Sequence, residues 1–318
     1  MNSTETIKYQ GIINSGSCYP KRLEEINQDL PFFEILKDQN NRYDIKFYNY
    51  EKEDNAPRVP YLQSYFKNSI LSNIEKSIDL KGFYNIELHD SYTYRNNNFN
   101  YKDVFTFSKF KDDKFPVLLP DIYQLGNYGN TLQFEDKIQW DKKINKAVFY
   151  GSSTGDRDPL KNKRINICQW ALEKPELYDY KITNIVQMDP KTVIEKIPNI
   201  DKIMTASVPV SEQNKYKYLF NIDGNTSKFD VWPYKTNSIV LKYESKEMLW
   251  YHPLMLDKFH FVEVNKNNME STINYYNNNP IDAQIISVNA KRFLHEILKP
   301  IAHQIYTVSL FESIGYNK

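Results

Sequence analysis

From Lys146 onward, the sequence alternates between short apolar runs and segments with helical spacing of apolar residues. Runs typical of buried strands cover 146–150, 178–183, 218–222, 238–243 and 259–264. Helical segments are predicted over 159–173, 190–196 and 282–314. Strands that alternate with helices form parallel sheets with helices on both faces, so this part of the chain is predicted to be α/β.

The N-terminal third has a weaker pattern. Residues 43–50 alternate like a strand, residues 61–80 have helical spacing, and short apolar runs follow at 83–88, 104–110 and 117–119. A chain of 318 residues is long enough for about two domains. We therefore expect an N-terminal domain over 1–140, a C-terminal domain over 141–280 and a helical tail over 281–318.

Charge and composition exclude several classes of partner. The 41 Lys and Arg nearly balance the 40 Asp and Glu, so the basic face of a nucleic-acid-binding protein is not expected. No uncharged apolar run approaches the ~18 residues of a membrane span, and the N-terminus lacks the pattern of a secretory signal. We expect a cytoplasmic protein with no nucleic-acid partner and no membrane span, in which Cys18 and Cys168 are reduced.

The most informative segment is the loop that follows the strand at 146–150. Loop N–H groups and the positive end of a helix can bind an anion, hydroxyl groups can donate to it, and an arginine can bind phosphate oxygens. A capped helix start at Asp158, without a ligand, fits the same residues. The candidate anion-binding residues are Gly151, Ser152, Ser153, Thr154, Gly155 and Arg157.

Asp156 and Asp158 in this loop form a D-x-D pattern, and paired carboxylates can hold a divalent metal ion. The intervening Arg157 and the following Pro159 favour a helix cap and an internal ion pair instead. The sequence therefore predicts no metal at this position.

A second strand, 218–222, also runs into a glycine-containing loop with hydroxyl groups and a cation. An ordinary turn between a strand and a helix is the alternative. The candidate ligand-binding residues of this second loop are Asp223, Gly224, Asn225, Ser227 and Lys228.

The strand predicted at 83–88 ends at His89 and Asp90. A carboxylate at the end of a strand that faces a cleft is a candidate general base. Read by itself, Asp90 also fits an ordinary turn residue.

Seven segments, taken in order, resemble glycosyltransferase family 90. They are NIELHD (85–90), VFTFSK (104–109), AVFYGSSTGDRDPL (147–160), NKYKYLFNIDGN (214–225), SIVLK (238–242), WYHPLMLDKFHFVEV (250–264) and AKRFLHEIL (290–298). This family includes Rumi-type protein O-glucosyltransferases, capsule xylosyltransferases and enzymes that modify lipopolysaccharide.

The resemblance implies a GT-B-like α/β architecture, with two Rossmann-like domains facing across a cleft and the C-terminal helices packing back. It implies an inverting transfer of a sugar, glucose or xylose, from a UDP-sugar to a hydroxyl of a glycan or protein acceptor, without a metal cofactor. By position, the loop at 151–160 would hold the diphosphate, the loop from Asp223 to Ser227 would be the second nucleotide loop, and Asp90 would be catalytic.

Two positions depart from the family pattern. His89 stands where the family has an arginine before the catalytic aspartate, and an arginine after the second loop falls near Lys228 or Phe229. Lys228 supplies a charge but not the bidentate geometry of arginine. The alternative function is therefore a catalytically silent sugar-nucleotide or carbohydrate-binding module that retains the fold.

Overall fold

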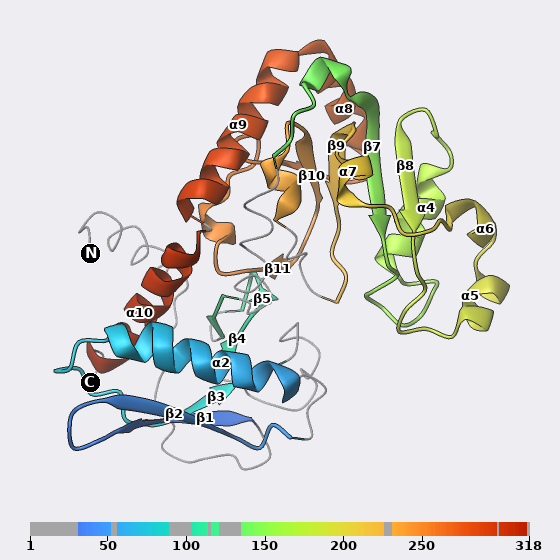
Figure 1. Ribbon diagram of the computed structural model, residues 1–318. Helices are drawn as coiled ribbons and strands as arrows, with labels where there is room; N and C mark the ends of the chain where they lie inside the picture. The colour runs from blue at the N-terminus through green and yellow to red at the C-terminus, as the bar shows by residue number, and fades with distance from the viewer. Residues whose placement is uncertain are drawn as a thin grey trace. The chain divides into compact units, whose positions relative to one another are not determined.

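The chain divides into two compact units (Figure 1). The N-terminal unit contains Met1–Tyr128, Lys246–Leu254 and Ile297–Lys318, and the C-terminal unit contains Gly129–Ser245 and Met255–Glu296. The structure is a computed structural model, and the residues that it describes are 31–51, 56–88, 104–113, 116–120, 135–225, 231–297 and 299–316.

The C-terminal unit is built on a five-stranded sheet. All of its neighbouring strands are parallel, in the order β12-β10-β9-β7-β8. The predicted α/β class is thereby confirmed, and each strand overlaps an apolar run of the sequence. The strands are β7 (Ile144–Gly151), β8 (Tyr178–Ile182), β9 (Tyr216–Asn221), β10 (Ile239–Tyr243) and β12 (Val262–Val264).

Short helices lie between these strands in the chain, and further helices of this unit follow the last strand, β12. Those between the strands are α4 (Lys163–Ala171), α5 (Pro190–Lys196), α6 (Ile200–Ile203) and α7 (Val210–Gln213), and those after β12 are α8 (Met269–Asn278) and α9 (Pro280–Ile297). The predicted bounds of α5, 190–196, are confirmed at both ends. Asp189 caps the first turn of this helix. The predicted start of α4 at Pro159 is wrong, because Asn162 and not Asp158 caps the helix.

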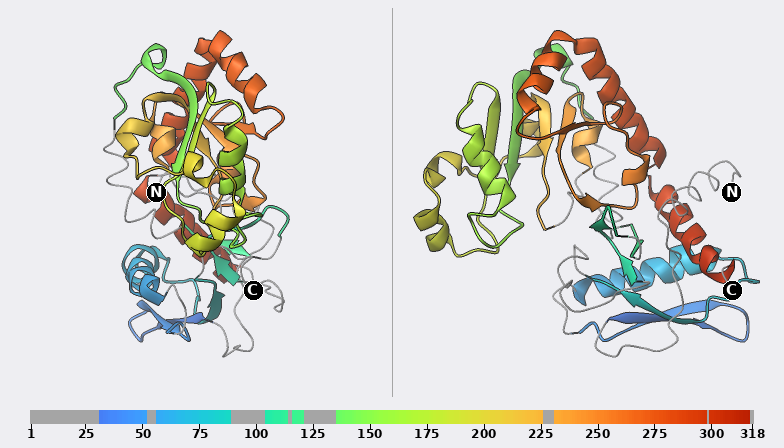
Figure 2. Two further views of the ribbon diagram at one scale, coloured as in Figure 1. Left: turned by 90° about the vertical axis from the view of Figure 1, so that its right-hand side faces the viewer. Right: turned by 180° about the vertical axis from the view of Figure 1, so that it is seen from behind.

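Helices α4 and α8 cover the same face of this sheet. Tyr178 and Tyr180 lie two residues apart on β8, so both side chains point to one face. Trp170 of α4 contacts Tyr178 with ring centroids 4.9 Å apart, and the Tyr180 hydroxyl lies 3.2 Å from the Met269 sulfur of α8. Figure 2 shows the helices of this unit around the sheet from two further directions.

A buried ion pair ties together the segments that lead into three of the strands. Lys143 Nζ lies 2.8 Å from Asp136 Oδ2, and the two side chains are 0% and 1% exposed. Asp136 also accepts hydrogen bonds from Asn214 Nδ2 at 2.9 Å and from the Asn237 N–H at 2.6 Å. Because Lys143, Asn214 and Asn237 precede β7, β9 and β10, this cluster holds the amino ends of those strands together.

Asp136→Asn is expected to lower the free energy of unfolding by about 3 kcal/mol, because it leaves the buried Lys143 ammonium without its anion. Urea unfolding measures this loss. The matched control is Asp141→Asn, which removes an exposed ion pair with Lys142 and is expected to leave the unfolding curve unchanged. Equal unfolding curves for the two variants would contradict a stabilising role for the pair.

The same carboxylate predicts a pH dependence. Burial raises the pKa of Asp136, but hydrogen bonds from Lys143, Asn237 and Asn214 lower it by more, so its pKa lies below the ordinary value. Its contribution to stability is therefore complete above the ordinary carboxyl pKa of about 4 and is lost as the pH falls towards the lower folded-state pKa. Asp136→Asn is expected to flatten this acid limb of the stability curve.

The N-terminal unit contains a mixed sheet in the order β2-β1-β3-β4-β6. Strand β1 is antiparallel to β2 and β3, whereas β3, β4 and β6 are parallel to one another. This sheet is therefore only partly the parallel sheet that we expected, because β1 runs antiparallel to both of its neighbours. Its strands are β1 (Phe32–Lys37), β2 (Tyr43–Tyr48), β3 (Gly82–Ile86), β4 (Val104–Thr106) and β6 (Val117–Leu118), and β5 (Lys109–Phe110) pairs with β11 (Glu247–Met248).

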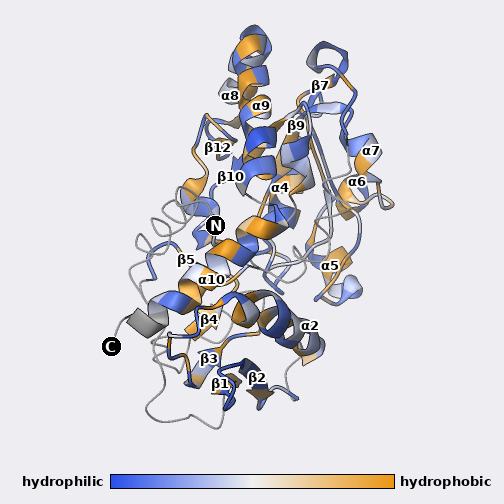
Figure 3. Cartoon of the chain, turned by 60° about the vertical axis from the view of Figure 1, so that its left-hand side comes forward, coloured by the Kyte–Doolittle hydropathy of each residue, from blue (hydrophilic) through white to orange (hydrophobic). Residues whose placement is uncertain are grey.

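Two helical segments pack on an aromatic core in this unit. Helix α2 (Val59–Tyr65) continues through a π-helical stretch, Phe66–Ile70, and a 3-10 turn, Leu71–Asn73. Phe311 of α10 (Pro300–Tyr316) lies 5.4 Å from Phe66 between ring centroids and 5.6 Å from Phe105. Helix α10 has apolar residues interspersed with polar ones (Figure 3), and most of its described side chains are buried.

The helical tail expected over 281–318 is divided between the two units. Helix α9 ends at Ile297 and α10 begins at Pro300. A proline has no N–H group and restricts the residue before it, so Pro300 separates the two helices. None of the helices in the described residues combines the length and apolar character that crossing a bilayer requires.

Candidate nucleotide site

The order of strands in the C-terminal unit defines where a ligand is expected. The chain passes from β7 to β8 at one edge, then returns past β7 to β9 and continues to β10 and β12. Ligands of open α/β sheets bind beyond the carboxyl ends of the strands at such a switch point. Here it lies between β7 and β9, and the loops 152–162 and 222–225 extend from these two strands. We call them the β7 loop and the β9 loop.

Asn162 determines the shape of the β7 loop. Its Oδ1 accepts hydrogen bonds from the N–H groups of Arg164 and Ile165, both at 3.1 Å, which caps α4. Its Nδ2 donates to the carbonyl oxygens of Ser153 at 2.8 Å and Asp156 at 2.9 Å. One fully buried side chain therefore holds the loop against the first turn of the helix.

Arg164 links the β7 loop to the β9 loop. Its guanidinium donates to the Ser152 carbonyl at 3.0 Å and the Thr154 hydroxyl at 2.6 Å. It also donates to the carbonyl oxygens of Ile222 at 3.2 Å and Asp223 at 3.1 Å. Because this side chain is only 8% exposed, its positive charge lies beneath the junction of the two loops.

Two of the predicted glycines lie where the loops touch. A Cβ atom on Gly224 would lie 2.5 Å from Thr154 Oγ1 and 2.8 Å from a terminal nitrogen of Arg164. Gly155 has a φ of +131°, and a Cβ atom there would lie 3.3 Å from the Gly224 carbonyl oxygen. The close approach of the two loops therefore depends on glycine at both positions.

Ser153, one of the predicted ligand-binding residues, uses its polar groups within the protein. Its hydroxyl donates to the Val186 carbonyl at 3.1 Å and accepts from the Val186 N–H at 2.9 Å. Its own N–H donates to the carbonyl of Asn184 at 3.0 Å. Ser153 is 0% exposed, so it anchors the β7 loop to the segment after β8.

The other predicted residues differ in exposure. Arg157 is exposed at the surface of the β7 loop, whereas Gly151, Ser152 and Asn225 are partly buried. Asp90, Ser227 and Lys228 lie outside the described residues. The structure therefore brings together six of the predicted residues at the loop junction, and these are Ser152, Ser153, Thr154, Gly155, Asp223 and Gly224.

Asp223 brings an unsatisfied acceptor to this junction. The residue is 6% exposed, and its Oδ2 is buried with no hydrogen-bond partner among the residues that the structure describes. Burial of a carboxylate oxygen lowers the stability of the folded protein unless a hydrogen-bond donor reaches that oxygen. A ligand hydroxyl or N–H group at the junction would supply such a donor.

The D-x-D carboxylates take part in local turns. Asp156 Oδ1 accepts from the N–H of Asp158 at 2.9 Å, and Asp158 Oδ1 accepts from the N–H of Leu160 at 3.2 Å. Asp158 Oδ2 lies 3.7 Å from Lys161 Nζ. Within the described part of the chain, no three His, Cys, Asp or Glu side chains are grouped as metal ligands.

The sequence-based prediction missed Asn162 and Arg164. Both lie in or beside a helical segment with Lys161 and Lys163, where a polar residue is most simply assigned to the solvent-exposed face. An asparagine immediately before a helix is a cap signal, so Asn162 could have been found. Arg164 had no such signal, because its partners Ile222 and Asp223 are more than 50 residues away in the sequence.

The chain is similar to several known proteins. It is 27% identical over 166 residues to uncharacterized protein 035R of Invertebrate iridescent virus 3, which is 50% of this chain and 14% of that protein. It is 31% identical over 132 residues to an O-glucosyltransferase rumi homolog of Aedes aegypti, which is 41% of this chain and 30% of that protein. The chain thus matches less than a third of the length of either curated relative.

Among solved structures, the chain is similar to Anabaena HepE in complex with UDP-glucose, with 8% identity and a TM-score of 0.39. That match covers 60% of this chain and 56% of HepE. The family model for glycosyl transferase family 90 matches residues 123–317, which is more than half of the chain. The chain therefore belongs to glycosyl transferase family 90.

Proposed function

We propose that this protein transfers a sugar from a UDP-sugar to a hydroxyl group of a glycan or protein acceptor, with inversion at the anomeric carbon. The observation that carries the proposal is the junction of the β7 and β9 loops at the switch point of a parallel sheet. Membership of a glycosyl transferase family supports sugar transfer as the reaction. The similarity to a protein named O-glucosyltransferase favours glucose as the sugar.

The UDP group would lie over the loop junction. Thr154 and the loop N–H groups would donate hydrogen bonds to the diphosphate, and Arg157 would bind its oxygens. The buried charge of Arg164, fixed by four hydrogen bonds, favours an anion above it. The orphaned Asp223 carboxylate oxygen would accept from a hydroxyl or N–H group of the nucleoside.

Asp90 would act as the general base. As the acceptor oxygen attacks the anomeric carbon, Asp90 takes the hydroxyl proton, the bond from that carbon to UDP breaks, and the bonding electrons leave with UDP. The new negative charge would be stabilised by Arg157 and the loop N–H groups, and Lys228 would add a second positive charge.

We propose that the transfer needs no metal. Asp156 and Asp158, the pair that would otherwise suit a divalent ion, already accept hydrogen bonds in turns of the β7 loop. This supports arginine, lysine and N–H groups as the donors that balance the diphosphate charge.

The test is to incubate the purified protein with UDP-glucose, UDP-xylose or UDP-galactose and to measure the release of UDP, with and without EDTA. We expect release from at least one donor, and EDTA should leave its rate unchanged. A requirement for Mn²⁺ would contradict the metal-free reaction. Binding of a UDP-sugar without turnover across an acceptor panel would favour the silent binding module, and absence of binding would contradict the proposal.

A further inference from the structure

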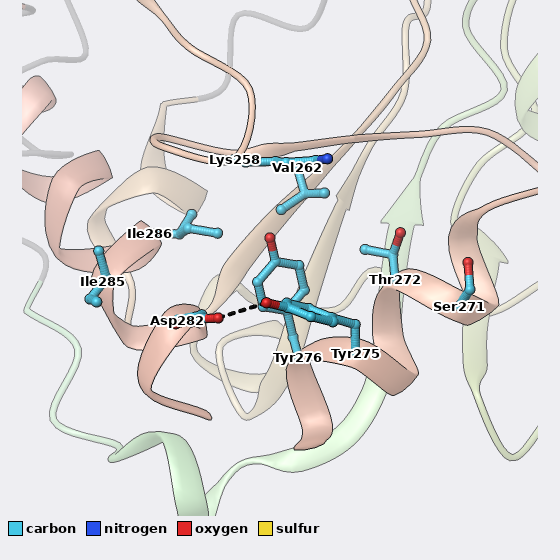
Figure 4. Close-up of a pocket in the computed structure, with 9 residues that line it drawn as sticks. All are labelled: Lys258, Val262, Ser271, Thr272, Tyr275, Tyr276, Asp282, Ile285 and Ile286. Atoms are coloured by element: carbon cyan, nitrogen blue, oxygen red, sulfur yellow. Dashed lines mark hydrogen bonds between the residues drawn. The ribbon is translucent and has the colours of Figure 1, made fainter. Parts of the chain in front are cut away.

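A cavity of about 580 Å³ lies in the C-terminal unit beside α8 and α9 (Figure 4). Tyr275 and Tyr276 of α8, Asp282 and Ile285 of α9, and Lys258 from the loop before β12 contribute to its walls. Its volume lies within the range of about 300–1,000 Å³ that is typical of small-molecule sites. The candidate nucleotide site does not include any of these residues.

The cavity lies towards the opposite end of the sheet from the β7 and β9 loops. Lys258 precedes β12, and Val262, another wall residue, is the first residue of that strand. The β7 and β9 loops follow the last residues of their strands. Because all five strands are parallel, the beginning of β12 and the ends of β7 and β9 lie at opposite ends of the sheet.

Polar groups with different hydrogen-bonding capacities face the cavity. The Tyr275 hydroxyl donates to Asp282 Oδ2 at 2.8 Å, which fixes the ring and leaves the second carboxylate oxygen as an acceptor. The Tyr276 hydroxyl points towards Val262 and Lys258 (Figure 4). Burial raises the pKa of Tyr276 to about 12, so this hydroxyl remains a neutral donor at neutral pH.

Apolar surface lies beside these polar groups. Tyr275 is 51% exposed and Ile285 is 52% exposed, so both leave apolar surface in contact with water. The Tyr275 and Tyr276 rings meet edge to face, with centroids 5.0 Å apart. The cavity therefore offers an exposed aromatic ring that a flat apolar surface can cover.

This combination restricts the chemistry of the ligand. One carboxylate and one ammonium group nearly cancel, so neither a phosphate nor a cation finds an excess of opposite charge. A wholly apolar ligand would desolvate Asp282 and Lys258 without pairing them. A sugar ring has C–H groups that pack on an aromatic ring and hydroxyl groups that both donate and accept.

We propose that this cavity binds a segment of a neutral glycan, separately from the UDP-sugar. The further step, that this glycan is the acceptor, rests on the proposed function. A glycan held here would be retained by the C-terminal unit while another part of the same glycan reacts.

The test is to titrate the protein, without UDP, with cellobiose, maltose and xylobiose in calorimetry. We expect at least one of these disaccharides to bind, and Tyr275→Ala to weaken that binding by about tenfold or more, because the ring face is lost. Tyr275→Phe keeps the ring and should retain most of the affinity. Tyr61→Ala, at an exposed tyrosine of the N-terminal unit, is the matched control and should bind like the wild type.

Binding of none of the three disaccharides, or equal binding to the wild type and Tyr275→Ala, would overturn the proposal. UDP binding is measured in parallel and is expected to be the same in both proteins; its loss in Tyr275→Ala would contradict a separate site. Disaccharide binding that Tyr275→Ala removes, in a protein that binds no UDP, would support the glycan site and contradict the proposed function.

Discussion

Arg164→Ala is expected to abolish measurable UDP binding and to lower the free energy of unfolding by about 4 kcal/mol. The guanidinium donates to three carbonyl oxygens and one hydroxyl, divided between the β7 and β9 loops. Alanine leaves these acceptors without their donor and removes the positive charge beneath the junction. Calorimetry with UDP and urea unfolding measure the two effects.

Two further variants distinguish the loss of the Arg164 hydrogen bonds between the two loops from general damage to the fold. Arg164→Lys keeps the charge but cannot reach both loops with one ammonium group, so we expect intermediate UDP affinity. Lys163→Ala removes an exposed cation from the same helical turn and should bind UDP like the wild type. A folded Arg164→Ala protein with wild-type affinity for UDP would show that the junction of the loops is not the nucleotide site.

Asp90→Asn is expected to slow sugar transfer by about 10²–10⁴-fold, the usual contribution of a general base. Asparagine keeps the size of the side chain but cannot take the proton of the acceptor hydroxyl. UDP binding should be unchanged, because Asp90 is assigned to the acceptor and not to the nucleotide. The assignment comes from the family resemblance of the segment at 85–90.

The rate is measured as UDP release with the donor that the wild type uses. Asp112→Asn, at an exposed carboxylate of the N-terminal unit, is the matched control and should transfer at the wild-type rate. Full activity of Asp90→Asn would remove Asp90 from the role of base. A simultaneous loss of UDP binding would point to a structural defect or a nucleotide contact instead.

Much of the C-terminal unit could be predicted because its local signals agree with its packing. The apolar run in the middle of β7 is buried between β8 and β9, and Asp189 with Pro190 marks the beginning of α5. The glycines at 155 and 224 indicated two loops with unusual backbone requirements. Their position at the ends of β7 and β9 is where the sheet order makes a ligand site.

The contacts between distant segments could not be predicted in this way. Ser153 looks like a donor to a ligand, but its hydroxyl is occupied by Val186, in a segment with no motif. Arg164 looks like one more charge on a basic helix start, although it is buried against Asp223. Local periodicity reports the face of a helix or strand and contains no information about which distant loop will lie against it.

The central claim is that UDP binds where the β7 and β9 loops meet and that Asp90 acts on the acceptor. Calorimetric titration of UDP into the wild type, Asp90→Asn and Arg164→Ala tests whether the loop junction binds UDP and whether Asp90 lies outside the nucleotide site. We expect equal dissociation constants for the wild type and Asp90→Asn, and no measurable binding to Arg164→Ala. Absence of UDP binding in the wild type, or equal binding to all three proteins, would contradict the claim.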